Sequence, residues 1–182
     1  MAYCTQTLGG ITLDCTNSMG GIKSVWVGNY GDINGQPTLD ETTGEINQID
    51  FVSGKTFDTV FKPYQFRKQT GSMSSTLTAD ETTGVNFVTT ELSLVFTKME
   101  KNKRLELTAL SIGQLVVIVE DCNGEYYYLG YDDYVSTSAG GGNTGTSKTD
   151  SNAYTLTLKD ESTTYPYLVN KTYMQTLLGI KV

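Results

Sequence analysis

Residues 72–97 read SMSSTLTADETTGVNFVTTELSLVFT, and this stretch decides the fold class. Along 72–79 every second residue belongs to one face, and the turn sequence Asp80–Gly84 follows. Such alternation with a period of two is typical of β-strands that bury one face. The stretch therefore predicts two strands in a long antiparallel hairpin. The apolar side of the second strand carries Val88, Leu92, Leu94 and Phe96.

Two further strands are predicted upstream of the hairpin. Residues 22–28 (IKSVWVG) and 46–52 (INQIDFV) are rich in β-branched and aromatic residues, which favour strands. Between them, residues 29–45 predict a loop, because Asn, Gly and Asp are frequent there. Residues 1–21 contain two Gly-Gly pairs, which break regular structure, and they are predicted to form an irregular N-terminal arm.

The segment 60–67 has a strand-like pattern of its own. A period of two places Val60, Tyr64 and Phe66 on one face. Pro63 has no N–H to donate to a neighbouring strand. The segment is therefore expected to be an edge strand or to carry a bulge at the proline.

The turn sequence DETTG occurs twice, at 40–44 and at 80–84. A fixed spacing of this kind can signal an internal repeat. Because the flanking residues do not match well, we interpret the two copies as similar turns rather than as a repeated unit.

Residues 98–112 form the one predicted helix. The preceding Thr97–Glu100 fits a capping box, in which the Thr and Glu side chains satisfy free backbone N–H groups, and Gly113 is a suitable stop. The face expected to be buried carries Leu105, Ala109 and Ile112. The remaining face carries Lys101, Lys103 and Arg104. That basic face is expected to be solvated, with a contact surface for a partner subunit as the alternative.

A second hairpin has the clearest turn signal in the chain. Leu115–Asp121 and Tyr126–Tyr131 are predicted strands, and residues 122–125 read CNGE. Asn-Gly as a two-residue loop requires positive φ at both positions, which matches strand twist. Both faces of this hairpin are partly apolar, so both are expected to be covered. The two-residue loop would pair Val119 with Tyr128 and Ile118 with Leu129.

The rest of the chain is predicted as a loop, a strand and an apolar tail. Residues 138–152 (SAGGGNTGTSKTDSN) predict a long flexible loop that becomes ordered only through contacts between subunits. Residues 153–159 alternate in the manner of a strand. We assign 22–169 to a single β-rich domain and 170–182 to a C-terminal extension. The extension is apolar enough that it should pack on its own core or on the next subunit.

The composition excludes several function classes. The chain has 182 residues, the length of about one domain, and it contains no histidine. Histidine-based acid/base catalysis, nucleophile pairs and metal ligation are therefore excluded. The net charge of −7 argues against a generic nucleic-acid binder, which needs a basic face.

The sequence also predicts in which cellular compartment the chain is made and whether its cysteines are oxidised. The longest apolar run, Leu115–Val119, is far shorter than the roughly 20 residues of a spanning helix, so no membrane insertion is expected. The first residues lack the features of a secretory signal, and synthesis and folding in the cytosol are expected. Cys4, Cys15 and Cys122 should then be reduced thiols rather than a disulfide or a zinc site.

No catalytic, cofactor-binding or metal-ligating residues are predicted, and the chain is not expected to be an enzyme. Gly140–Gly145 has the glycine spacing of a phosphate loop but lacks its lysine. Asp121–Glu125 has oxygens that suit calcium, but a hairpin turn explains it better. The pair Ser147-Lys148 lies in a glycine-rich segment that would not hold it in place. Paired carboxylates for glycoside hydrolysis remain a weak option.

The chain resembles the tail tube proteins of tailed bacteriophages, particularly of phages that infect gut Bacteroidota. The resemblance is one of overall pattern and spans roughly residues 19–169. It rests on five segments, namely Met19–Val27, Phe66–Leu77, Thr89–Phe96, Gly142–Gly145 and Asn152–Leu158.

The resemblance implies a mainly β fold, a β-sandwich or open β-barrel with one α-helix at about 98–112. It implies a virion structural protein without cofactors, whose copies form stacked rings, usually hexamers, around a channel for DNA ejection. Its partners would be its own copies, other tail or head–tail connector proteins, and DNA that passes without specific binding. A long tail tube and the ring of a short tail both remain open.

A binding module is the alternative reading. A capsid-decorating or glycan-binding β-sandwich module of the virion would also be β-rich and poor in charge. The cluster Tyr126–Tyr128 with Tyr131 could stack on sugars, although packing within the sheet explains it more simply.

Overall fold

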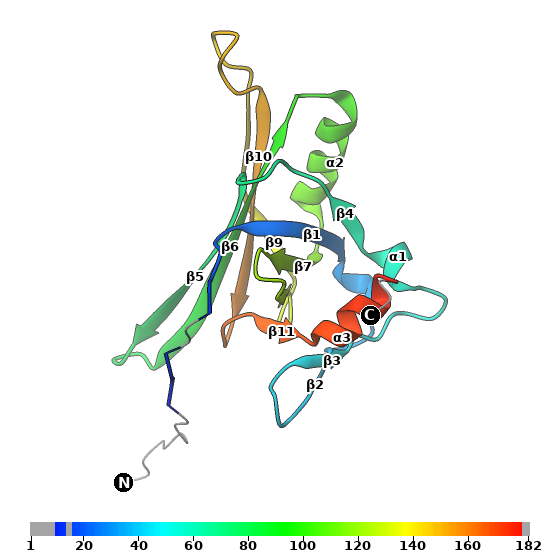
Figure 1. The fold of residues 1–182 in the computed structure, drawn as a ribbon, viewed down its shortest axis with the longest axis vertical. Coiled ribbons are helices and arrows are strands. Elements are labelled where there is room, and N and C mark those ends of the chain that lie inside the picture. Colours follow the sequence, from blue (N-terminus) through cyan, green and yellow to red (C-terminus); the bar gives the residue numbers. More distant parts are fainter. Residues whose placement is uncertain (1–9, 14–15, 180–182) are drawn as a thin grey trace.

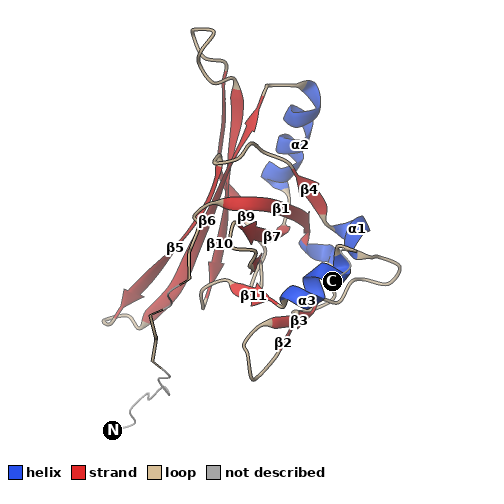
Figure 2. Cartoon of the chain, viewed as in Figure 1, coloured by secondary structure: helices blue, strands red, loops and turns tan. Residues whose placement is uncertain are grey.

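The computed structural model describes residues 10–13 and 16–179, and it is mainly β, with two sheets that pack as a sandwich (Figures 1 and 2). The mainly β prediction is confirmed. The four-stranded sheet has the order β5-β6-β10-β9, with bounds Gly71–Asp80, Val85–Thr97, Ala153–Ser162 and Ser136–Asn143. The seven-stranded sheet has the order β2-β3-β11-β8-β7-β1-β4, with bounds Thr38–Leu39, Ile46–Gln48, Tyr167–Val169, Tyr126–Leu129, Leu115–Asp121, Ile22–Asn29 and Lys62–Tyr64.

The long hairpin β5–β6 is confirmed and forms half of the four-stranded sheet. Its register pairs Ser72 with Ser93 and Leu77 with Val88. The predicted apolar side of β6 is buried, and Leu92 and Leu94 are almost fully inaccessible to solvent. Every residue of β10 pairs with β6, on the side away from β5. The predicted strand 153–159 is therefore confirmed and extends to Ser162.

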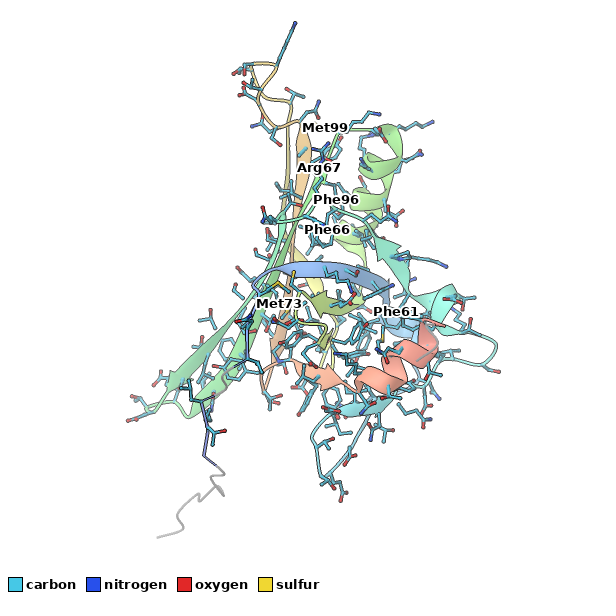
Figure 3. All side chains as sticks on the ribbon, viewed as in Figure 1. Phe61, Phe66, Arg67, Met73, Phe96 and Met99 are labelled. Carbon is cyan, nitrogen blue, oxygen red and sulfur yellow. The ribbon has the colours of Figure 1, made fainter. Side chains whose placement is uncertain are left out.

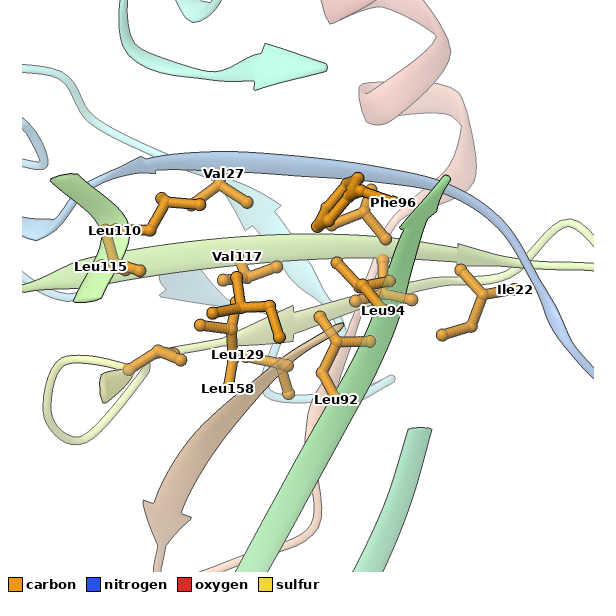
Figure 4. Close-up of a cluster of buried hydrophobic side chains, with 14 residues drawn as sticks. Ile22, Val27, Leu92, Leu94, Phe96, Leu110, Leu115, Val117, Leu129 and Leu158 are labelled. Atoms are coloured by element: carbon orange, nitrogen blue, oxygen red, sulfur yellow. The ribbon is translucent and has the colours of Figure 1, made fainter. Parts of the chain in front are cut away.

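β7 lies inside the seven-stranded sheet and has apolar residues on both faces. One face belongs to the core cluster between the two sheets, together with residues of β6 and β10 (Figure 4). The other face belongs to a second cluster on the far side of the sheet. The expectation that both faces of this hairpin are covered is therefore confirmed. The alternate residues Val117 and Val119 lie in the first cluster, and Val116 and Ile118 lie in the second.

The register of the hairpin β7–β8 differs from the prediction by one residue. Ile118 pairs with Tyr128 and Val119 with Tyr127, rather than with Leu129 and Tyr128. The loop is one residue longer than the predicted Asn-Gly loop, because the Asp121 N–H donates to the Glu125 carbonyl across three residues. Only Gly124 has a positive φ, and the Asp121 carboxylate accepts from two N–H groups of the turn. This side chain stabilises a three-residue turn with glycine in the left-handed position.

The predicted helix exists as α2, Lys101–Ile112, but it buries a different face. Leu110 is buried and Leu107 packs against the sandwich core, whereas Leu105 and Ile112 are 52% and 86% exposed. The predicted capping box is absent, because β6 continues to Thr97 and Lys98 then turns with a positive φ of 66°. The helix ends before Gly113 as predicted, although that glycine has a negative φ.

Two short helices were not predicted, α1 (Phe57–Val60) and α3 (Lys171–Leu177). α3 begins at Asn170, whose side-chain oxygen accepts from the Tyr173 N–H at 3.2 Å. Its Met174 is fully buried in the second cluster. The described part of the C-terminal extension therefore packs on its own core, one of the two expected outcomes.

The segment 60–67 does not form one continuous strand. Val60 ends α1 and packs in the second cluster, whereas Tyr64 and Phe66 contact the first, so the predicted common face is wrong. The cause is the helical turn before β4, which rotates the chain. Pro63 does lie in an edge strand, since β4 pairs only with β1, as predicted.

The glycine-rich segment 138–152 is in part a strand, which corrects the prediction of a loop ordered only by subunit contacts. Residues 138–143 belong to β9 and pair with β10 within one chain. The loop that remains is 144–152, where the Asp150 carboxylate accepts from the Thr146 and Ser147 N–H groups, both at 2.8 Å. The pairing energy of an antiparallel ladder outweighs the low strand propensity of glycine here.

The smaller expectations upstream are confirmed in part. The strand predicted over 22–28 is β1, while that over 46–52 shortens to β3. The two DETTG turns have the same geometry, with the Thr42 and Thr82 N–H groups each donating to an Asp carboxylate at 2.8 Å. They lie in different sheets and join strands of unequal length, as two similar turns would. The arm is irregular where the structure describes it, and Cys4 and Cys15 lie outside the described residues.

Candidate assembly surface

The edges of the seven-stranded sheet are protected against pairing with another chain. One edge strand, β2, has two residues, and the other, β4, has three. β4 also carries Lys62 and Pro63, a charge and a residue that cannot donate. Short edge strands, lysine and proline are the usual means by which proteins keep sheet edges from associating.

The edges of the four-stranded sheet lack this protection. β5 has ten residues and β9 has eight, and no further strand of the described chain pairs with their outer sides. Neither strand contains proline or lysine, and Asp80, at the end of β5, carries their single charge. Long uncharged edges with unpaired N–H and C=O groups are templates for pairing with another chain.

The bare backbone of β9 makes its edge especially accessible. Three glycines, residues 140–142, follow one another in the strand, and a groove of about 470 Å³ runs between them and α2. A methyl group added at Gly140 or Gly141 would meet no atom closer than 3.4 Å, whereas one added at Gly142 would meet the side chains of Met99 and Tyr154 at 2.8 and 2.9 Å. At these three positions the strand has no side chain of its own that would hinder another extended chain.

The outer face of the four-stranded sheet carries mostly small polar side chains, with Val85, Phe87 and Val95 of β6 as its larger apolar residues. Inward-facing residues of β6 and β10 pack in the sandwich core, so the alternate residues face away from it. Charge on this outer face is confined, within the described strands, to Asp80, Glu91, Lys159 and Glu161, and the last two form an ion pair at 2.6 Å. The hydroxyl residues that β5, β6 and β10 contribute to the face are Ser72, Ser74, Thr76, Thr78, Thr89, Ser93, Thr97, Thr155 and Thr157.

The order of the strands determines how copies could join. β5, β6, β10 and β9 alternate in direction, so the two edge strands run antiparallel to each other. If copies stand side by side with the same orientation, β9 of one copy meets β5 of the next in antiparallel fashion. A sheet with an even number of strands therefore continues its hydrogen-bonding pattern across the junction without interruption.

Two buried polar atoms, Asp160 Oδ1 and Tyr128 Oη, have no hydrogen-bond partner among the described residues. Asp160 faces inward from β10 and is only 3% exposed. Burial raises its pKa to about 6, and the nearby carboxylates of Asp132 and Asp133 act in the same direction, against a hydrogen bond from the Gly130 backbone. Ionised Asp160 therefore destabilises the folded protein at neutral pH.

Asp160→Asn is expected to stabilise the protein at pH 7.5 and to flatten its pH dependence. The native carboxyl binds its proton more tightly than the unfolded one, whose pKa is 3.8, so the wild-type free energy of unfolding falls as the pH rises from 4 to 7. The expected loss across that window is about 2–3 kcal/mol. Urea unfolding at several pH values measures it, and an unchanged slope in the variant would contradict this account.

The residues that the sequence singled out for chemistry do not form a site. Residues 140–143 continue as strand, and Asp121–Glu125 form the turn of β7–β8, with both Asp121 oxygens bonded within the turn. No group of three His, Cys, Asp or Glu side chains suited to a metal occurs within 10–13 and 16–179. Cys122 is a free thiol. The helices of the described chain are all too short or too polar to cross a bilayer.

The tyrosine cluster belongs to the core rather than to an exposed stacking platform. Tyr126 and Tyr128 are buried in the second cluster, and Tyr127 is partly buried against the first. Tyr131 packs on Tyr167, with ring centroids 4.5 Å apart. Packing within the sheet therefore explains these residues.

Comparison of the chain with protein-family models, with curated proteins and with solved structures finds no match. The sequence alone did not reveal the assembly surface, because the surface is marked only by the absence of proline and charge from two strands. The absence of proline and charge in 71–79 and 136–143 would have been informative only once both segments were known to be edges.

Proposed function

We propose that this protein is a structural subunit of a bacteriophage tail, a tail tube or tail ring protein that acts in the virion after synthesis in the host cytoplasm. Copies pair β9 with β5 of the next copy and close into a ring. Rings stack, with other tail or connector proteins at the ends. DNA passes through the channel during ejection, and the outer face of the four-stranded sheet lines it.

The contrast between the two sheets is the observation that carries this proposal. One sheet has edges of two and three residues with a proline, and the other has edges of ten and eight residues without proline or lysine, although β9 has a bulge opposite Thr157 and Leu158. A chain that avoided association altogether would protect all four edges. Selective protection supports association through the four-stranded sheet alone.

The two free edges differ from each other, which favours a ring over a dimer. Pairing of β9 with β5 joins different surfaces of identical copies, and such head-to-tail contacts repeat until a rotation closes them. In the closed ring, the four-stranded sheets together form one continuous barrel. The sandwich core and the second cluster then lie on the outside of the barrel wall.

The chemistry of the outer sheet face suits a channel through which DNA must slide. Binding to DNA is driven mainly by lysine and arginine, which release counterions from the phosphates. The face carries Lys159 as its one cation within the described strands, and Glu161 neutralises it. A hydroxyl-rich wall with a slightly negative net charge has no group that would bind the DNA phosphates strongly.

Adding cations to this face should make the channel retain DNA. Tubes of the double variant Thr89→Lys, Thr157→Lys are expected to hold short duplex DNA at least tenfold more tightly than wild-type tubes at 0.1 M salt, with binding lost as salt rises. Fluorescence anisotropy of labelled duplexes measures this. Thr172→Lys on α3 is the matched control, and equal retention by control and double variant would refute the proposed lining.

Electron microscopy of the purified protein, combined with size-exclusion chromatography, tests the function itself. We expect rings or tubes with a central channel. A monomer that binds capsids or glycans would instead support the alternative of a decorating or glycan-binding module. A solitary particle with neither property would contradict both.

A further inference from the structure

The two ends of the four-stranded sheet carry opposite charge. At the end where β6 runs into α2 and β9 runs into β10, the segments 98–104 and 144–152 contain five basic and two acidic residues, a net charge of +3. These segments contact each other, since the Lys98 N–H donates to the Asn152 carbonyl at 2.7 Å. In the view of Figure 3, Arg67 and Met99 are both labelled toward this end of the sheet.

The cations at this end are available for a partner. Lys101, Arg104 and Lys148 are exposed, and none of them forms an ion pair within the described chain. Lys98 is paired with Glu100 at 2.6 Å, and the Lys103 ammonium donates to the Thr97 carbonyl. α2 also begins here, so the positive end of its dipole adds to the potential.

The opposite end of the sheet is acidic. It comprises the β5–β6 turn and the loops on either side of it, the segments 78–86, 130–134 and 161–166, which contain five acidic residues and no lysine or arginine. Asp132 is tied to this end by hydrogen bonds from Ser162 and Thr163. Asp80, Glu81, Asp132 and Asp133 are exposed and have no cationic partner within the described residues.

β6 separates the two ends by 13 residues, or about 40 Å of extended chain, which is several Debye lengths at physiological salt. The opposite charges therefore do not neutralise each other within one copy. In a ring, every copy presents its basic end on one rim and its acidic end on the other.

We propose that the opposite charges of the two ends hold stacked rings together: the basic end of one ring binds the acidic end of the next ring. The partner is a second copy of this chain, and the inference rests on the proposed function. The acidic tip at Asp80-Glu81 of one ring faces Lys101, Arg104 and Lys148 of the ring beyond it. Rings stacked in reverse would set like charges against each other, so the polarity also fixes a single direction of growth.

Charge reversal at each end separately tests the proposal. The basic-end variant is Lys101→Glu, Lys148→Glu, and the acidic-end variant is Glu81→Lys, Asp133→Lys. Glu at position 101 lies in the first turn of α2, where a negative charge favours the helix, so the fold should be preserved. Lys171→Glu at the start of α3 is the matched control.

Each variant alone is expected to form rings but to reduce the mean number of stacked rings per particle at least tenfold, as counted by electron microscopy. Mixing the two variants should give pairs of unlike rings, because the intact basic end of one variant, with a net charge of +3, can bind the intact acidic end of the other, while both altered ends carry a net charge of −1. The variant carrying all four substitutions has two ends of like charge and should not stack. Wild-type and control stacks should shorten as salt rises.

The outcomes separate this inference from the function on which it rests. Absence of rings in the wild type would refute the proposed function. If both single-end variants form rings that stack as well as wild-type rings, charge-driven stacking is refuted. The proposal that the chain forms rings would still stand. Failure of the mixture to stack would likewise count against charge complementarity.

Discussion

Proline at one of two neighbouring positions of β9 is expected to abolish assembly and leave the monomer folded. In an antiparallel edge strand, successive residues direct their N–H groups alternately toward the neighbouring strand and toward the open edge. Gly140 and Gly141 are such neighbours, and they pair with Leu156 and Thr155 of β10. Proline at the inward position removes a ladder hydrogen bond and should cost about 1–3 kcal/mol. Proline at the outward position removes only a donor that the next copy needs.

Chromatography and thermal unfolding of the two proline variants measure these effects together. Gly140→Ala and Gly141→Ala are the matched controls, because each adds a side chain but keeps the N–H, and both have room for a methyl group. We expect both alanine variants to assemble. Two proline variants that assemble as well as wild type would show that β9 is not the junction.

Met174→Ala is expected to cause the largest loss of stability. Met174 is fully buried where α3 closes the second cluster over β7. Truncation of a buried methionine costs about 2–5 kcal/mol, because it removes buried surface and leaves a cavity. Chemical denaturation of the monomer measures the change in the free energy of unfolding.

Thr172→Ala provides the control on the same helix. Thr172 is exposed, and alanine favours the helix, so its effect should stay within about 0.5 kcal/mol. Equal stability of the Met174 and Thr172 variants would show that the C-terminal helix is dispensable for the domain.

The strands with strong alternation could be predicted from the sequence, because each has one buried face. Leu92 and Leu94 on β6, and Leu156 and Leu158 on β10, fall where a period of two places them. The apolar character of both faces of β7 likewise predicted a strand covered on both sides. These patterns arise from burial, which acts residue by residue.

Features that depend on contacts between distant segments were not predictable in this way. The buried face of α2 is set by where β9 and the sandwich core lie, and the helix carries apolar residues on both sides, so Leu105 and Ile112 were as plausible as Leu107 and Leu110. β9 looks like a linker because Ser-Ala-Gly-Gly-Gly has low strand propensity, and only β10 makes it a strand.

The turn of β7–β8 shows how a single side chain changes a register. Asn123-Gly124 alone favours a two-residue loop, but the carboxylate of Asp121 satisfies two N–H groups of a longer loop. The pairing therefore shifts by one residue, which exchanges the faces of the partner strand. α3 could have been found from its Asn170 cap followed by Tyr173, Met174 and Leu177 at helical spacing.

Cryo-electron microscopy of the assembled particle, at a resolution that separates strands, tests the central claim most directly. The account predicts a continuous antiparallel barrel in which β9 of each copy is hydrogen-bonded to β5 of the next, with Thr89, Ser93 and Thr157 facing the channel. Copies joined through the seven-stranded sheet, or a channel lined by basic residues, would contradict it.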